Sequence, residues 1–230
     1  MLIIGHRGSA GTSPENTLIS FEEAIQAGAD AVEFDVQKCA TGELVIIHDR
    51  KVDRTTNGSG LVSQLSFNEL RQLDAGGGQR IPSLRETLDH IDNRVEVHVE
   101  LKSEGISQQA ALLINEYIQS GRYSAESFVI SSFNHRELAH FQKFNKNCRI
   151  AALIAHTPLA YARRFSDLDY WSINVDIDNC SPAFVRSAHS RGYKFLVYTV
   201  NEIADRERLA AMEVDGVFTN YPAKFRNTEE

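Results

Sequence analysis

The chain has 230 residues, of which 42% are hydrophobic and 24% are charged, and its formal net charge is -7. This composition is typical of a globular protein with a substantial core and excludes a disordered or fibrous chain. The acidic balance argues against nucleic-acid binding, and no apolar run is long enough to span a membrane. Three widely spaced cysteines, Cys39, Cys148 and Cys180, argue against a disulfide framework and favour a reducing compartment.

Short apolar segments recur along the chain, and their hydrophobicity is continuous rather than alternating. Such segments are typical of strands buried on both faces, as in a parallel sheet. The predicted strands are Leu2–Ile4, Ala31–Val36, Val95–Leu101, Phe128–Ser131, Arg149–Ile154, Trp171–Val175, Lys194–Val200 and Gly216–Thr219. A further strand, Leu44–His48, follows the second too closely for a crossover helix to connect them.

Helix signals lie between these strands. The clearest predicted helices run from about Asn16 to Ala27, from Ser107 to Gly121, and from Ser181–Pro182 to Gly192. Capping boxes are predicted at Ser66 with Glu69 and at Ser83 with Glu86. The chain therefore alternates between strands and helices along most of its length.

This alternation predicts the fold. Eight strands alternating with helices, without a linker between them, predict one domain over residues 1–230 with the (β/α)8 architecture of a TIM barrel. Leu44–His48 is expected to return from the second strand as the other arm of a β-hairpin. A two-residue turn at Thr41–Gly42 would then place Asp35 opposite His48. A doubly wound open sheet is the alternative fold.

Acidic side chains lie within or at the ends of two predicted strands. Glu33 and Asp35 are two residues apart, so they share one face of their strand, and Glu100 has the same spacing to Lys102. Neighbouring buried carboxylates repel one another unless a cation compensates their charge. Because oxygen ligands suit hard divalent ions, Glu33, Asp35 and Glu100 are predicted to bind Mg²⁺ or Ca²⁺ at the barrel mouth.

Two histidines come directly from strand ends beside these carboxylates. His6 follows the first strand and His48 ends the hairpin arm, and two histidines can share the roles of general base and general acid near neutral pH. Arg7 could contact a phosphate through two N–H groups, and Lys102 could add a point charge. Together with a metal, these groups indicate phosphoryl-transfer chemistry. The other histidines are interpreted as structural or surface residues.

Seven motifs extend over nearly the whole chain, and their order and spacing are more specific than any one of them. They are His6-Arg7-Gly8, Pro14-Glu15-Asn16-Thr17, Glu33-x-Asp35, His48-Asp49, Glu100-x-Lys102, Tyr198-Thr199-Val200-Asn201 and the segment from Asp215 to Pro222. Together they resemble the glycerophosphodiester phosphodiesterase family. The resemblance implies a (β/α)8 barrel that hydrolyses glycerophosphodiesters to sn-glycerol 3-phosphate and an alcohol.

The resemblance also implies roles for the candidate residues. The metal ligands would be Glu33, Asp35 and Glu100, the acid/base pair His6 and His48, and the phosphate-binding residues Arg7 and Lys102. The sequence leaves open whether water or the substrate's own hydroxyl attacks the phosphorus. It also leaves open which histidine is the acid, although we favour His6 as the base and His48 as the acid.

Two departures from the family pattern concern the rim and the end of the chain. Residues 52–80 correspond to a small family insertion near the substrate entrance, shortened at Gly76–Gly78, and Asn220 stands where many relatives have Asp. The lack of an N-terminal secretory signal resembles the cytoplasmic branch of the family, which salvages diesters such as glycerophosphocholine. Phe133, Trp171 and Tyr198 could contact a choline headgroup, and barrel packing explains them equally well.

Two other functions are considered. A phosphodiesterase acting on lysophospholipids or phosphoinositides would need an apolar rim, whereas the apolar residues within 64–79 have a spacing that fits ordinary packing. A non-catalytic barrel that serves as a binding or scaffold protein would have lost a metal ligand or a histidine, and none is lost here. We therefore expect a small-molecule substrate, no nucleic acid and no stable membrane association. The oligomeric state is not predicted.

Overall fold

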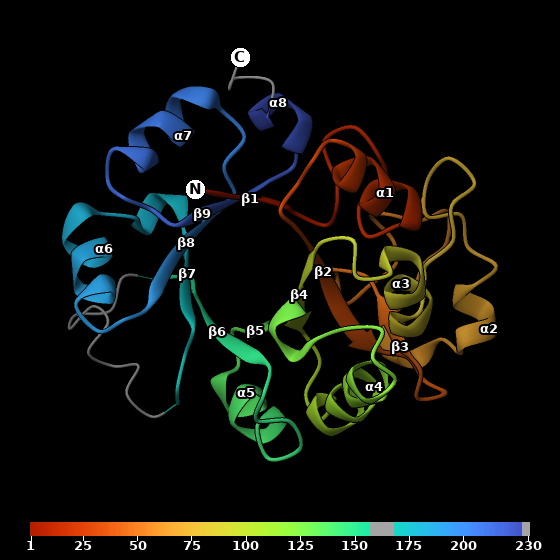
Figure 1. The fold of residues 1–230 in the computed structure, drawn as a ribbon. Helices are drawn as coiled ribbons and strands as arrows, with labels where there is room; N and C mark the ends of the chain where they lie inside the picture. Colours follow the sequence, from red (N-terminus) through yellow and green to blue (C-terminus); the bar gives the residue numbers. More distant parts are fainter. Residues whose placement is uncertain (157–167, 227–230) are drawn as a thin grey trace.

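In the computed structural model, which describes residues 1–156 and 168–226, eight parallel strands form a closed barrel with helices around the outside (Figure 1). The parallel strands are β1 (Leu2–Gly5), β2 (Ala31–Lys38), β4 (Glu96–Leu101), β5 (Phe128–Ser132), β6 (Arg149–Ile154), β7 (Ser172–Asp176), β8 (Lys194–Tyr198) and β9 (Gly216–Thr219), and β3 (Leu44–Ile46) is antiparallel to β2. The barrel closes because β1 pairs with both β2 and β9. The predicted (β/α)8 fold is confirmed, and the open sheet is excluded.

Local sequence signals set the helix boundaries. The helices are α1 (Leu18–Gln26), α2 (Phe67–Leu70), α3 (Leu84–Ile91), α4 (Ser107–Gln119), α5 (His135–Phe141), α6 (Pro182–His189), α7 (Ile203–Ala210) and α8 (Pro222–Arg226). Both predicted capping boxes form, at Ser66 and at Ser83, and Ser181 caps α6 with proline at its first position. The three helices expected most clearly are therefore present, each slightly shorter than predicted.

The hairpin of β2 and β3 differs from the prediction by one residue. The turn comprises residues 40–42, and Gly42 adopts φ +100°, a conformation that favours glycine. With three residues in the turn, Ile47 lies opposite Asp35 and donates its backbone N–H to the Asp35 carbonyl at 3.0 Å. The expectation that Asp35 faces His48 across the hairpin is therefore wrong, because His48 lies one residue beyond that pair.

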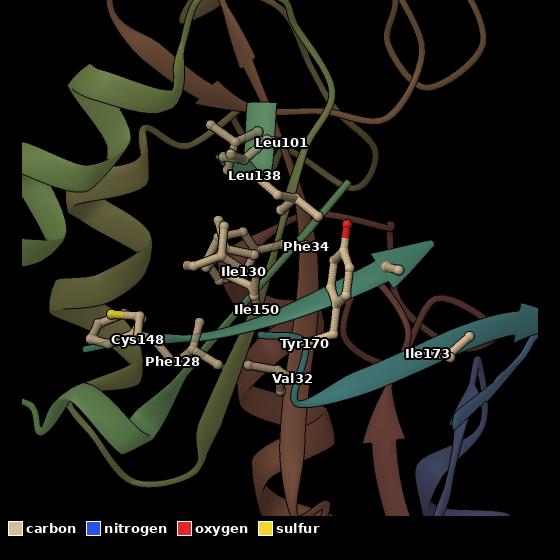
Figure 2. Close-up of a cluster of buried hydrophobic side chains, with 14 of the residues drawn as sticks. Val32, Phe34, Leu101, Phe128, Ile130, Leu138, Cys148, Ile150, Tyr170 and Ile173 are labelled. Atoms are coloured by element: carbon tan, nitrogen blue, oxygen red, sulfur yellow. The ribbon is translucent and has the colours of Figure 1, made fainter. Parts of the chain in front are cut away.

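The alternation of side chains along the strands decides which residues face the barrel interior. Val32, Phe34 and Val36 point outward and are fully buried in the layer between the barrel and the helices, part of which Figure 2 shows. Because successive residues of a strand point to opposite faces, Glu33 and Asp35 point inward. Burial of the apolar side chains outside the barrel therefore fixes the two acidic side chains toward its interior.

Residues of the small insertion and the hairpin form a second core beside the barrel. Its buried side chains are Cys39, Val45, Ile47, Val52, Val62, Leu70, Ala75 and Ile81. Leu65, Phe67 and Leu73 pack against this cluster, so the apolar residues within 64–79 serve ordinary packing, as their spacing predicts. No helix in the described part of the chain combines the length and the apolar character needed to cross a membrane.

The amino-terminal end of the barrel interior is filled by a charged and aromatic group. Trp171 lies immediately before β7, and the guanidinium of Arg149 stands 4.6 Å from the centre of its ring. Arg149 also forms an ion pair with Glu96 at 3.0 Å. A headgroup contact at Trp171 is therefore wrong, because this residue lies at the end of the barrel opposite to Tyr198, the last residue of β8.

Candidate active site

A cavity of about 130 Å³ opens at the carboxyl ends of the strands. All the predicted site residues except Asp35 line it, together with an aromatic wall formed by Phe133, Tyr198 and Phe218. Asp35 is only 1% exposed and lies behind the lining residues. The strand ends thus bring together the seven residues that the sequence singled out.

Three buried carboxylates form the acidic centre of this site. Glu33, Asp35 and Glu100 each place an oxygen within 4.8 Å of the others. Asp35 and Glu100 are register partners on the adjacent strands β2 and β4, which explains their proximity. Burial, reinforced by the neighbouring carboxylates, raises the pKa of Glu33 well above its ordinary value and that of Glu100 to about 7. Such a cluster has the donor set of a hard divalent cation.

Asp35 differs from its two neighbours because positive and polar groups surround it. Lys102 Nζ lies 3.3 Å from one carboxylate oxygen, Arg7 Nε lies 3.4 Å from the other, and Asn16 Nδ2 donates a hydrogen bond at 2.8 Å. Burial opposes ionisation, but the charges of Lys102 and Arg7 outweigh it and hold the pKa of Asp35 below its ordinary value. Asp35 is therefore the carboxylate of the three whose ionised form its surroundings favour.

A tight backbone turn positions the residues that follow β1. Arg7 has φ 51°, and its backbone N–H donates to Glu33 Oε2 at 2.9 Å. Gly8 has φ +82°, and a Cβ at this position would lie 2.5 Å from the backbone of Ser20. Only glycine fits this turn, which places His6 and Arg7 at the mouth of the barrel.

His6 has a neutral hydrogen-bond partner. Its Nδ1 lies 2.7 Å from Oδ1 of Asn220, and since an amide oxygen only accepts, Nδ1 carries the hydrogen and Nε2 keeps its lone pair. Burial, reinforced by the charge of Arg7, lowers the pKa of His6 to about 4. His6 is therefore neutral at physiological pH. The departure at Asn220 thus falls on the direct partner of this histidine.

His48 has a charged partner instead. Its Nδ1 lies 2.6 Å from Oδ1 of Asp49, and Arg54 holds this carboxylate through Nε and Nη2 at 2.7 and 3.0 Å. Arg54 also contacts both oxygens of Glu15 at 2.7 and 2.8 Å, and Glu15 accepts from Nη1 of Arg7 at 2.8 Å. One chain of ion pairs, here called the Arg54 network, therefore connects His48 to Arg7.

Sequence reasoning missed the role of Arg54 in this network. Arg54 lies in the insertion that was expected only to shape the rim, and its partner Glu15 is 39 residues away. The motif containing Glu15 and Asn16 was recognised only through the family resemblance. In the structure, Glu15 of this motif holds the side chain of Arg7, and Asn16 holds the side chain of Asp35.

Lys102 completes the polar wall of the cavity. Its Nζ lies 2.9 Å from Glu100 Oε1 and 3.3 Å from Asp35 Oδ1. Burial opposes its charge, but these two carboxylates raise the pKa of Lys102 above its ordinary value. The site therefore combines three carboxylates with two permanent cations, Arg7 and Lys102, around one small cavity.

Residues 6–224 match the glycerophosphoryl diester phosphodiesterase family. The chain belongs to this family. A glycerophosphodiester phosphodiesterase of Caldanaerobacter subterraneus subsp. tengcongensis is 35% identical over 239 residues, which cover 98% of this chain and 96% of that protein. One from Bacillus altitudinis is 32% identical over 237 residues, which cover 96% of this chain and 94% of that protein.

Solved structures show the same relationship. One of them is an Oleispira antarctica phosphodiesterase in complex with the product sn-glycerol-3-phosphate. It is similar to this chain with a TM-score of 0.91 and 30% sequence identity, and the match covers 99% of this chain and 96% of that protein. A glycerophosphodiester phosphodiesterase from Agrobacterium tumefaciens has a TM-score of 0.81 at 28% identity, with 99% of each chain covered. The family resemblance, the TIM-barrel fold and the assignment as a phosphodiester hydrolase are confirmed, which excludes the non-catalytic scaffold.

Proposed function

We propose that this phosphodiesterase hydrolyses glycerophosphodiesters to sn-glycerol 3-phosphate and an alcohol, with one divalent cation, Mg²⁺ or Ca²⁺, bound by Glu33, Asp35 and Glu100. The observation that carries the proposal is the set of three buried carboxylates within 4.8 Å of one another. The raised pKa values of Glu33 and Glu100 are the expected signature of ligands whose charge a cation would compensate. When bound, the cation supplies positive charge against the phosphate oxygens.

Arg7 and Lys102 hold the phosphate in this proposal. Both line the cavity, and nearby carboxylates favour the charged form of each side chain. Glu15 fixes the guanidinium of Arg7 before substrate arrives, which lowers the entropic cost of orienting it. Lys102 lies directly after β4 and acts as a point charge rather than a planar fork.

The partners of the two histidines divide the proton transfers between them. His6 is neutral, offers the lone pair of Nε2 and hydrogen-bonds to an amide, so it serves as the base that accepts a proton from the attacking hydroxyl. His48 hydrogen-bonds to the carboxylate of Asp49, which orients its ring, and it serves as the acid that donates a proton to the departing alcohol oxygen. His6 can accept the proton from water or from the substrate's own hydroxyl.

The size of the cavity, the net charge and the packing of the insertion indicate the class of substrate. The small-molecule substrate is supported by the size of the cavity, and a net charge of -7 disfavours nucleic acid. Lysophospholipids are disfavoured because the apolar residues of the insertion are packed in the second core.

We place the chain, as one catalytic domain over residues 1–230, in the cytoplasm, which the free thiols of Cys39, Cys148 and Cys180 support.

A product analysis tests this proposal. Purified protein with Mg²⁺ or Ca²⁺ is incubated with glycerophosphocholine, glycerophosphoethanolamine and glycerophosphoglycerol, and the products are resolved by phosphorus NMR. We expect sn-glycerol 3-phosphate and the free alcohol from at least one diester. Formation of phosphocholine and glycerol from glycerophosphocholine would mean cleavage of the other ester bond and would contradict the proposal.

A further inference from the structure

A second hollow adjoins the catalytic cavity on the side of His48. This groove has a volume of about 660 Å³, about five times the 130 Å³ of the catalytic cavity. The two hollows share His48, Glu100, Lys102 and Phe133 as lining residues, so one passes into the other beside the catalytic groups. His6 lines only the smaller cavity. A diester bound at the metal site can therefore extend from the small cavity into the groove.

The groove carries two cations that have no carboxylate partner among the residues that the structure describes. Lys38, the last residue of β2, and Arg50, two residues after His48, both line it. Neither forms an ion pair within residues 1–156 and 168–226, whereas Arg54 and Lys102 are paired with carboxylates. Lys38 and Arg50 are therefore free to pair with a ligand.

The acidic residues of the chain are nearly absent from this groove. Among its described lining residues, the carboxylates are the candidate metal ligand Glu100 and the exposed Glu104. The groove is thus locally cationic on a protein whose net charge is -7. Unpaired cations that face a concave surface attract anions, and this attraction is lost as salt increases.

We propose that the groove binds the alcohol portion of the substrate and that Lys38 and Arg50 select alcohols that carry a second phosphate. This inference rests on the proposed function and names the substrate class of the same site. The position of His48 between cavity and groove fits this orientation, because the acid must reach the oxygen of the departing alcohol.

The reaction balances as a hydrolysis. The bond between phosphorus and the alcohol oxygen in the groove breaks, and the hydroxyl of water is added to phosphorus overall. His6 takes up the proton that the attacking water loses, and His48 donates a proton to the alcohol oxygen, so the pair holds the same number of protons before and after. Proton exchange with solvent then returns each histidine to its starting state. The products are sn-glycerol 3-phosphate and an alcohol that still carries its own phosphate.

The aromatic side chains of the site would favour a cationic alcohol rather than an anionic one, and this contrast makes the proposal testable. Phe133 is 48% exposed, borders both hollows and meets the ring of Tyr198 edge to face at 6.1 Å. Aromatic rings attract quaternary ammonium groups, so a choline diester would be preferred if these rings dominated recognition. The two unpaired cations instead favour an anionic alcohol and repel choline.

Three diesters of sn-glycerol 3-phosphate distinguish these preferences. Their alcohols are glycerol, choline and glycerol phosphate, which are neutral, cationic and anionic. For the wild-type protein we expect kcat/KM to be about 10-fold higher for the phosphate-bearing alcohol than for glycerol at low salt. Lys38→Gln and Arg50→Gln should each reduce this ratio by about 3-fold or more. Lys51→Gln, which removes a neighbouring exposed cation outside the groove, is the matched control and should leave the ratio unchanged.

The outcomes separate this inference from the function on which it rests. Equal kcat/KM for the neutral and the phosphate-bearing alcohol in the wild-type protein would overturn it, as would a preference for choline. An equal loss of preference in Lys51→Gln and Arg50→Gln would also overturn it, because net charge alone would then explain the effect. A metal-loaded protein that hydrolyses none of the three diesters would contradict the proposed function itself.

Discussion

The two ends of the barrel interior treat charge in different ways. At the amino-terminal end, Arg149 is paired with Glu96 and covers Trp171, so each charge has a partner. At the carboxyl end, three carboxylates lie within 4.8 Å of one another, and burial with mutual repulsion raises the pKa values of Glu33 and Glu100. The paired end stabilises the fold, whereas the carboxyl end keeps an unfavourable arrangement that a cation and a phosphate would satisfy.

His98 separates these two ends within the barrel. It is fully buried, and Phe218 lies 5.5 Å from its ring in an edge-on contact. In the described part of the chain, neither ring nitrogen has a hydrogen-bond partner. Burial, reinforced by the charge of Arg149, lowers the pKa of His98 to about 3, so the middle layer stays neutral between two charged ones.

The largest expected effect comes from removing a charge at the carboxyl end. Glu33→Gln should lower kcat by about 10³-fold or more, since it removes a proposed metal ligand. The metal-free variant should keep or exceed the wild-type melting temperature, because glutamine replaces a carboxyl group whose ionised form is disfavoured by burial and by Asp35 and Glu100. Activity assays with metal and calorimetry without metal measure the two effects. A lower melting temperature with full activity would show that Glu33 is a structural residue.

The two histidines should differ in their dependence on the leaving group. His48→Ala should lower kcat/KM by about 10²- to 10⁴-fold on glycerophosphocholine but far less on a nitrophenyl ester, whose leaving group needs little protonation. His6→Ala should cost similar factors on both substrates. A differential loss at His6 alone would reverse the assignment, and equal losses on both substrates for both variants would refute the division of roles.

The Arg54 network offers a smaller effect at the same end. Arg54→Ala should lower kcat by about 10- to 100-fold, because Asp49 and Glu15 lose the residue that holds them toward His48 and Arg7. Added guanidinium should restore part of the activity. Arg71→Ala is the control, since Arg71 lies in the same insertion and pairs with Glu86 at 2.9 Å. Equal losses in both variants without rescue would make the role of Arg54 purely structural.

The amino-terminal end should respond in stability rather than activity. Arg149→Met removes the partner of Glu96 and the cation above Trp171, so the free energy of unfolding should fall by about 1–3 kcal/mol. The metal-loaded variant should retain wild-type kcat, because Arg149 lies at the other end of the barrel. Chemical denaturation and an activity assay decide this, and a reduced kcat in a stably folded variant would contradict the separation of the two ends.

The smallest expected effect depends on pH. Asp215 accepts hydrogen bonds from Lys194, His189 and the backbone N–H of Phe195 at 2.8–2.9 Å. Although burial opposes them, these contacts hold its pKa below the ordinary value, so its contribution to stability is present above about pH 4 and is lost as pH falls through the lower folded-state pKa. Asp215→Asn should cost about 1 kcal/mol at pH 7 and flatten the loss of stability below pH 4. If denaturation curves of Asp215→Asn showed the same loss of stability below pH 4 as the wild-type protein, this contribution of Asp215 would be excluded.

Local patterns predicted most of the fold but not all of its geometry. Continuous apolar runs and caps such as Ser181–Pro182 depend on neighbouring residues, and the corresponding elements formed as expected. The predicted register between Asp35 and the hairpin arm was wrong because the register depends on the turn conformation at Gly42. Trp171 was misplaced although it begins its predicted strand, because only the carboxyl ends of parallel strands face the site.

The candidate site was predictable to the extent that its residues lie on strand ends. Glu33, Asp35 and Glu100 converge because adjacent parallel strands end at the same edge, a consequence of the fold alone. Arg54 was not predictable in this way, because its contacts join a loop after β3 to the loop before α1. Such contacts depend on how loops fold against each other, which no local periodicity encodes.

The central claim is that the carboxylates at the barrel mouth act through a bound divalent cation. The most direct measurement is a metal titration of chelator-treated protein, with release of sn-glycerol 3-phosphate from a glycerophosphodiester as the signal. We expect activity to fall to background after chelation and to return saturably with Mg²⁺ or Ca²⁺ at one ion per chain. Undiminished activity in protein shown by elemental analysis to be free of metal would contradict the claim.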